Sequence, residues 1–147
     1  MTERITELSE VISSARGAFS ARVMARERGD GDWEGWLEFA PVGKVTATFV
    51  TGIETHQHDR VALERWASGL TRVYAEGALA RARAAESAHV TSELLEALRE
   101  IVEALDRRIP HVEQANEPEI AAAAKRLKTE AVRRIADLRR QLETNAE

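Results

Sequence analysis

Cysteine is absent from this chain of 147 residues. Its absence excludes disulfides, thiolate metal ligands and a nucleophilic thiol, and it is typical of a protein kept in a reducing compartment. No stretch approaches the ~20 consecutive apolar residues that a membrane-spanning helix needs. The first residues also lack the apolar run of a signal peptide. From these absences we expect a cytoplasmic protein with no membrane partner.

An excess of one charge is also absent. Lys and Arg number 21 against 25 Asp and Glu, and the formal net charge of −4 gives no general reason to bind nucleic acid. Aromatic residues make up only 5%, but hydrophobic residues reach 44%, which is enough for a folded core. The length allows one domain, or one small domain with a helical extension.

What the chain has instead is a long helical pattern. Apolar or small residues recur at alternating spacings of three and four residues, which keeps one stripe of a helix facing a partner helix. This seam consists of Leu63, Trp66, Leu70, Val73, Gly77, Ala80, Ala84, Ser87, Thr91, Leu94, Leu98, Ile101 and Leu105. It predicts either one very long helix over 60–108 or two helices with a break near 87–91.

The middle of the seam is small or weakly polar. Gly77, Ala80, Ala84 and Ser87 allow close helix–helix approach, and an isolated long helix would leave them without a partner. They could meet a neighbouring helix of the same chain. We predict that they form an interface with a second copy or with another protein.

The N-terminal third predicts a short helix followed by strands. Residues 3–14 place Ile5, Leu8 and Ile12 at helical spacing, and this helix would need a docking surface. Apolar residues then alternate with polar ones over 19–25, 33–39 and 45–50, as in half-buried strands. We expect a three-stranded antiparallel meander covered on its apolar face by the helix that opens near residue 60.

The C-terminal part predicts an antiparallel helical hairpin. Asn116, Pro118 and Glu119 read as the start of the last helix, which would pack against residues 92–108. The first arm is rich in acidic residues and the second in basic residues, and such opposite charges set partner and orientation. The predicted fold class is α+β, with a small α+β module over 1–85 and a helical hairpin over 86–147.

One loop concentrates polar side chains with ligand or acid–base character: Glu54, His56, His58, Asp59 and Arg60. Two histidines with a nearby carboxylate could bind a metal ion, but the spacing is weak and no third histidine is near. We therefore predict no metal site, and a solvated loop in which Asp59 caps the following helix. The alternative is a small ligand-binding or enzymatic domain that uses loop 54–60.

The three tryptophans and one arginine stripe complete the candidates. Trp33 and Trp66 would form core near that loop, whereas Trp36 faces the other side of its strand and would contact a partner or lie under the N-terminal helix. Arginines at 126, 133 and 140 line one side of the last helix. They offer a second alternative, nucleic-acid binding, but ion pairs with the acidic arm explain them more simply.

Part of the chain resembles a group of small bacterial proteins of unassigned function. The resemblance covers about residues 18–83. It rests on the segment Trp33-Glu34-Gly35-Trp36-Leu37-Glu38-Phe39, on Glu54, Thr55, Gln57 and Arg60, and on Leu63, Trp66, Ala67, Gly69, Leu70, Tyr74, Gly77, Ala78 and Leu79. It implies no activity and no cofactor. We therefore expect a non-enzymatic interaction or assembly subunit that oligomerises through its long helix and hairpin.

Overall fold

The structure is a computed structural model that describes residues 1–15, 17–43 and 47–146. The chain divides into two compact units, Met1–Ala85 and Glu86–Glu147. We call them unit 1 and unit 2 and describe each by itself. Unit 1 holds an antiparallel sheet and unit 2 a pair of helices, so the predicted α+β class is confirmed.

Unit 1 is built on a sheet in the order β1-β2-β3-β4, with β5 also paired to β3. The strands are β1 (Thr2–Ser14), β2 (Gly17–Glu27), β3 (Trp33–Val42), β4 (Phe49–Val50) and β5 (Thr55–Gln57). The predicted strands over 19–25 and 33–39 are present and pair as expected. Of the predicted third strand, residues 45 and 46 lie outside the described residues, and Phe49–Val50 forms β4.

The predicted helix over 3–14 is wrong, because this segment is the strand β1. Two register irregularities interrupt its pairing with β2, one after Arg4 and one after Glu7. An extra residue in a bulge shifts which side chains face the core. Ile5, Leu8 and Ile12 therefore all approach the core although their spacing of three and four residues is helical. A strand with these irregularities therefore places apolar residues toward the core at the same spacing as a helix would.

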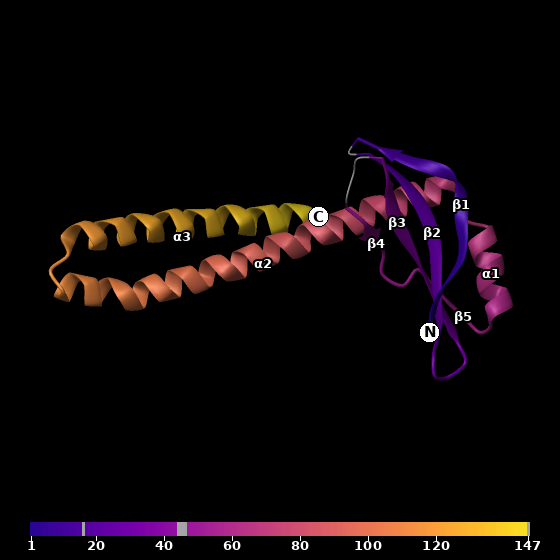
Figure 1. Ribbon diagram of the computed structural model, residues 1–147, viewed down its shortest axis with the longest axis horizontal. Coiled ribbons are helices and arrows are strands. Elements are labelled where there is room, and N and C mark those ends of the chain that lie inside the picture. The colour runs from indigo at the N-terminus through magenta and orange to yellow at the C-terminus, as the bar shows by residue number, and fades with distance from the viewer. Residues whose placement is uncertain (16, 44–46, 147) are drawn as a thin grey trace. The chain divides into compact units, whose positions relative to one another are not determined.

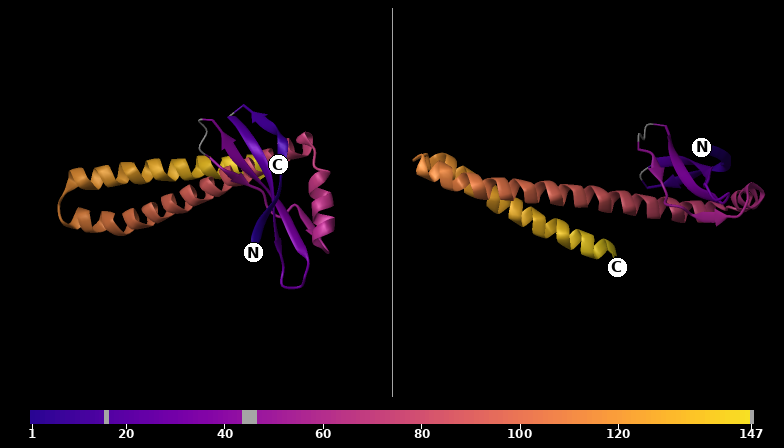
Figure 2. Two further views of the ribbon diagram at one scale, coloured as in Figure 1. Left: turned by 45° about the vertical axis from the view of Figure 1, so that its right-hand side comes forward. Right: turned by 90° about the horizontal axis from the view of Figure 1, so that it is seen from below.

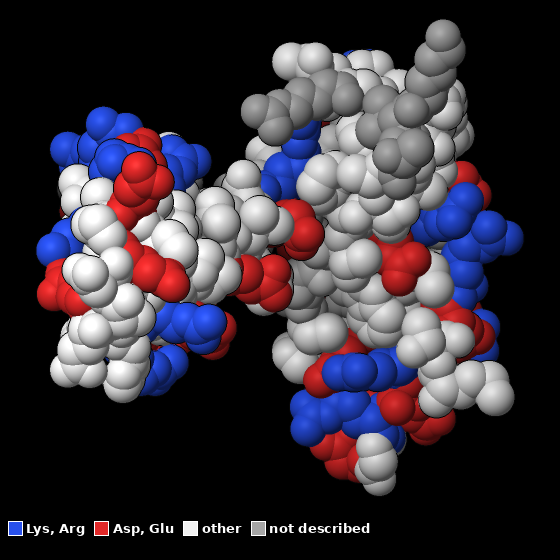
Figure 3. Space-filling view, turned by 60° about the vertical axis from the view of Figure 1, so that its left-hand side comes forward, with Lys and Arg blue, Asp and Glu red and all other residues white. Residues whose placement is uncertain are grey.

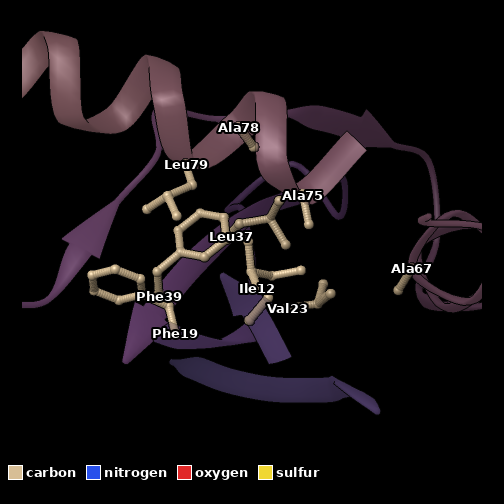
Figure 4. Close-up of a cluster of buried hydrophobic side chains, with 10 residues drawn as sticks. Ile12, Phe19, Val23, Leu37, Phe39, Ala67, Ala75, Ala78 and Leu79 are labelled. Atoms are coloured by element: carbon tan, nitrogen blue, oxygen red, sulfur yellow. The ribbon is translucent and has the colours of Figure 1, made fainter. Parts of the chain in front are cut away.

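The core of unit 1 lies between the sheet and the first turns of a long helix, α2 (Arg72–Gln114) (Figure 4). Alternate residues of β2 and β3 point to one face, where Phe19, Leu37 and Phe39 are at most 1% exposed. Ala75 and Leu79 of α2 pack against them. Small alanines let the helix backbone approach the sheet closely, which explains why an alanine-rich segment covers it.

The predicted single helix over 60–108 is two helices. The first, α1, spans Arg60–Ser68 and ends at the C-cap Gly69, whose N–H donates to the carbonyls of Arg65 and Trp66. Thr71 then caps α2, because its hydroxyl accepts a hydrogen bond from the N–H of Tyr74 at 3.2 Å. No break occurs near 87–91, and α2 continues through this stretch.

Unit 2 is the predicted helical hairpin, formed by the C-terminal part of α2 and by α3 (Pro118–Ala146) (Figure 1). The first arm extends beyond Arg108, because Pro110 lies inside α2 rather than in the turn. The chain turns at Asn116, whose φ of 60° is left-handed and suits asparagine. Pro118 opens α3 as predicted. In the right-hand view of Figure 2 α3 diverges from α2 toward its C-terminus, whereas in the left-hand view the two helices approach each other there, so they cross at an angle.

Candidate functional site

The two helices of unit 2 hold together through an inner seam of apolar side chains. On α2 it consists of Leu95, Leu98, Val102, Leu105, Ile109 and Val112, and on α3 of Ala121, Ala124, Ala131, Ile135, Leu138 and Leu142. These positions again alternate at three and four residues, except that Ala124 and Ala131 stand seven apart with Lys128 between them. Of their side chains, only Leu95, Ala121, Ala131 and Leu138 are fully buried within the described part of unit 2. The seam is therefore narrow.

A second set of large apolar side chains lies in solvent on the same unit. We call it the apolar stripe. It consists of Val90, Leu94 and Ile101 of α2 and Ile120 and Leu127 of α3, with relative exposures of 52%, 42%, 43%, 54% and 54%. Scattered single residues of this kind are ordinary, but a contiguous apolar patch marks an interaction site.

The stripe occupies one face of the hairpin. Leu94 and Ile101 each stand one residue before an inner-seam position of α2, which turns them about 100° to one side of it. On α3, Ile120 stands one residue before Ala121, and Leu127 one before Lys128. An antiparallel helix pair has a local two-fold axis normal to its plane, so equal offsets lie on the same face.

The opposite face is different. There, Ile109, Pro110 and Val132 line a groove of ≈ 540 Å³ whose edges carry Asp106, Lys125, Lys128 and Thr129. Lys128 pairs with Asp106, and Lys125 Nζ lies 2.6 Å from Glu113 Oε1. These two ion pairs join α2 to α3 and set their register. The predicted pairing of the acidic and basic arms therefore comes from lysines.

The arginine stripe has other partners than predicted. Arg133 pairs with Glu130 and Arg140 with Asp137, both within α3, rather than with the acidic arm. Arg126 has no ion pair among the residues that the structure describes. On the faces visible in Figure 3, Lys and Arg lie interspersed with Asp and Glu, and no broad area is basic alone. This distribution does not favour nucleic-acid binding.

The polar side chains of loop 54–60 in unit 1 make separate structural contacts. Asp59 caps α1 as predicted, since its Oδ1 accepts a hydrogen bond from the N–H of Ala62 at 2.7 Å. Glu54 instead accepts a hydrogen bond from the hydroxyl of Tyr74, and its carboxylate lies 3.0 Å from Arg81 Nη2. Burial of the Tyr74 hydroxyl raises the pKa of Tyr74, and the hydrogen bond to Glu54 raises it further. The carboxylate thus ties the β4–β5 connection to α2.

The two histidines do not converge. His56 Nδ1 on β5 lies 3.8 Å from Glu34 Oε1, while His58 Nε2 lies 3.0 Å from Asp59 Oδ2, and both are exposed. Over the described ranges no group of three His, Asp or Glu side chains is placed to hold a metal ion. Arg60 pairs with Glu64 and covers the ring of Trp33. Residues of loop 54–60 line none of the grooves found along the helices of unit 2 or beside Leu8 and Thr71, where the lining residues are all described ones.

Trp33 and Trp66 are half-buried rather than fully enclosed. Trp66 packs against the core of unit 1 because β3 has a glycine beneath it. A Cβ at Gly35 would lie 2.9 Å from Leu63 Cδ1 and 3.1 Å from Trp66 Cζ3. The alternation over 33–39 already placed Gly35 on this face of the strand, and a glycine inside a strand signals close approach of another group.

Trp36 lies on the open face of the sheet, opposite α1 and α2. Trp36 is only 9% exposed, because neighbouring charged side chains lie over its ring. The guanidinium of Arg26 stands 5.8 Å from the ring centroid, and Trp36 Nε1 donates to Glu38 Oε1 at 3.4 Å. Arg26 also pairs with Glu34 at 2.8 Å. With β1 a strand, no N-terminal helix covers this tryptophan.

The small-residue seam is largely in solvent. Ala80, Ala84 and Ser87 are exposed, and Gly77 is half-buried beside the side chain of Arg81. Near Ser87, where α3 ends, a polar groove of ≈ 580 Å³ opens between the helices of unit 2, lined among others by Thr91 and Arg134. These positions are accessible, as an interface requires, and their role stays a prediction.

Comparisons with models of known protein families, with curated proteins and with solved structures found no match. The resemblance to small bacterial proteins therefore stays a prediction. None of the helices over the described residues is long and apolar enough to cross a membrane. The apolar stripe is the feature that sequence reasoning misplaced. Leu94 and Ile101 were assigned to the helix seam, whereas two interleaved stripes exist on α2.

Proposed function

We propose that this chain is a non-enzymatic assembly subunit of the cytoplasm, in which unit 1 is a closed folded module and unit 2 is a docking surface for a protein. The observation that carries the proposal is the apolar stripe. Its five large side chains are each 42% or more exposed, on a hairpin whose inner seam is narrow. Two helices alone seldom bury enough apolar surface, and a further helix pair over the stripe would complete the core.

The interface predicted from the sequence is a separate candidate on α2. Ala80, Ala84 and Ser87 are exposed and small, so that a partner helix could approach the α2 backbone closely. Trp36 is a weaker candidate for contact, because Arg26 lies over its ring. An enzymatic function has less support, since the polar side chains of loop 54–60 are spent on a helix cap and on the ties of Glu54.

A matched pair of substitutions on α3 tests the proposal. Leu127→Glu puts a charge into the stripe, and Val132→Glu puts the same charge on the opposite face at a similar exposure of 48% against 54%. We expect the wild-type chain to migrate above its monomer mass of 16.3 kDa, purified or in a cell extract. Leu127→Glu should reduce this to the monomer mass, and Val132→Glu should not. Size-exclusion chromatography with light scattering measures both.

Two results would count against the proposal. One is a wild-type chain that is monomeric both when purified and in extract. The other is an assembly that both variants leave intact. Ala84→Glu tests the small-residue candidate on α2 separately. If Leu127→Glu dissociates the assembly and Ala84→Glu does not, the docking surface is confined to the hairpin.

A further inference from the structure

We draw no further inference here: the strongest candidate, the apolar stripe on one face of the helical hairpin, already carries the proposed function, and nothing in the structure shows what covers it.

Discussion

The two units bury their apolar side chains to very different extents. In unit 1 the sheet, α1 and α2 enclose side chains such as Phe19, Leu37 and Phe39, each at most 1% exposed. In unit 2 the inner seam encloses few side chains, while Leu94 and Leu127 remain 42% and 54% exposed. A sheet covered by a helix closes a core within one chain, whereas a pair of helices leaves part of each apolar surface open. This difference supports the proposal that unit 1 supplies stability and unit 2 association.

The same substitution in both units gives the largest expected effect. Leu37→Ala should destabilise unit 1 by about 4 kcal/mol, because a rigid core leaves a cavity, and Leu138→Ala should destabilise unit 2 by about 2 kcal/mol, because the helix pair can close over the gap. All three tryptophans lie in unit 1. Denaturation followed by tryptophan fluorescence therefore reports unit 1, and helical circular dichroism weights unit 2.

Equal losses for the two leucines would break the comparison, since they would mean that the hairpin core is as rigid as the sheet core. The measurement belongs at a protein concentration low enough to keep the chain monomeric. Repeating it at high concentration sharpens the contrast. There the transition of unit 2 should move to higher denaturant, and that of unit 1 should stay in place.

A glycine substitution probes how closely unit 1 is packed. Gly35→Ala should cost about 1–3 kcal/mol, because the added Cβ would lie 2.9 Å from Leu63 Cδ1. Gly29→Ala is the matched control, since no atom lies within 4 Å of its Cβ position. Fluorescence-detected urea unfolding measures both. A Gly35→Ala protein as stable as the control would show that α1 docks loosely and that unit 1 is less closed than described.

The helix cap on α1 has a smaller expected effect. Asp59→Ala removes the acceptor for the N–H of Ala62 and should destabilise unit 1 by about 1 kcal/mol. Asp59→Asn, which keeps an acceptor oxygen, is the control and should restore most of the loss. If alanine and asparagine behave alike, the cap contributes nothing and α1 is held by Leu63 and Trp66 alone.

Much of unit 1 was predictable from short-range signals. The alternation over 19–25 and 33–39 gave two strands, and the position of Asp59 before a helical pattern gave a cap that the structure confirms. The strand β1 was not predictable in this way. Its two bulges place Ile5, Leu8 and Ile12 toward the core at helical spacing, and bulges depend on pairing with β2, which no local pattern reveals.

The helices show the same limit at longer range. A continuous apolar rhythm from residue 63 to 105 hid the break at Gly69–Thr71, although a C-capping glycine and an N-capping threonine both stood in the sequence. The rhythm also merged two stripes of α2. Whether Leu94 faces α3 or solvent depends on the rotation of α2 about its axis. A shift of one residue turns a side chain by about 100°, which is enough to change the face it lies on.

The smallest effect concerns the ion pairs that align the hairpin. Lys128 and Asp106 are 40% and 50% exposed and form a pair across the two helices. Lys128→Asp should cost unit 2 about 0.2–1 kcal/mol, as exposed pairs usually do. Adding Asp106→Lys should recover most of the loss, because the reversed pair has the same geometry.

Arg139→Gln, also exposed on α3, serves as the control and should change nothing measurable. Added salt should reduce the cost of Lys128→Asp, because the charges are screened. A salt-independent loss that Asp106→Lys fails to restore would mean that the lysine acts by packing its alkyl chain over the seam. The register of α2 on α3 would then come from the apolar residues, and unit 2 would resemble unit 1 more closely than its exposed stripe suggests.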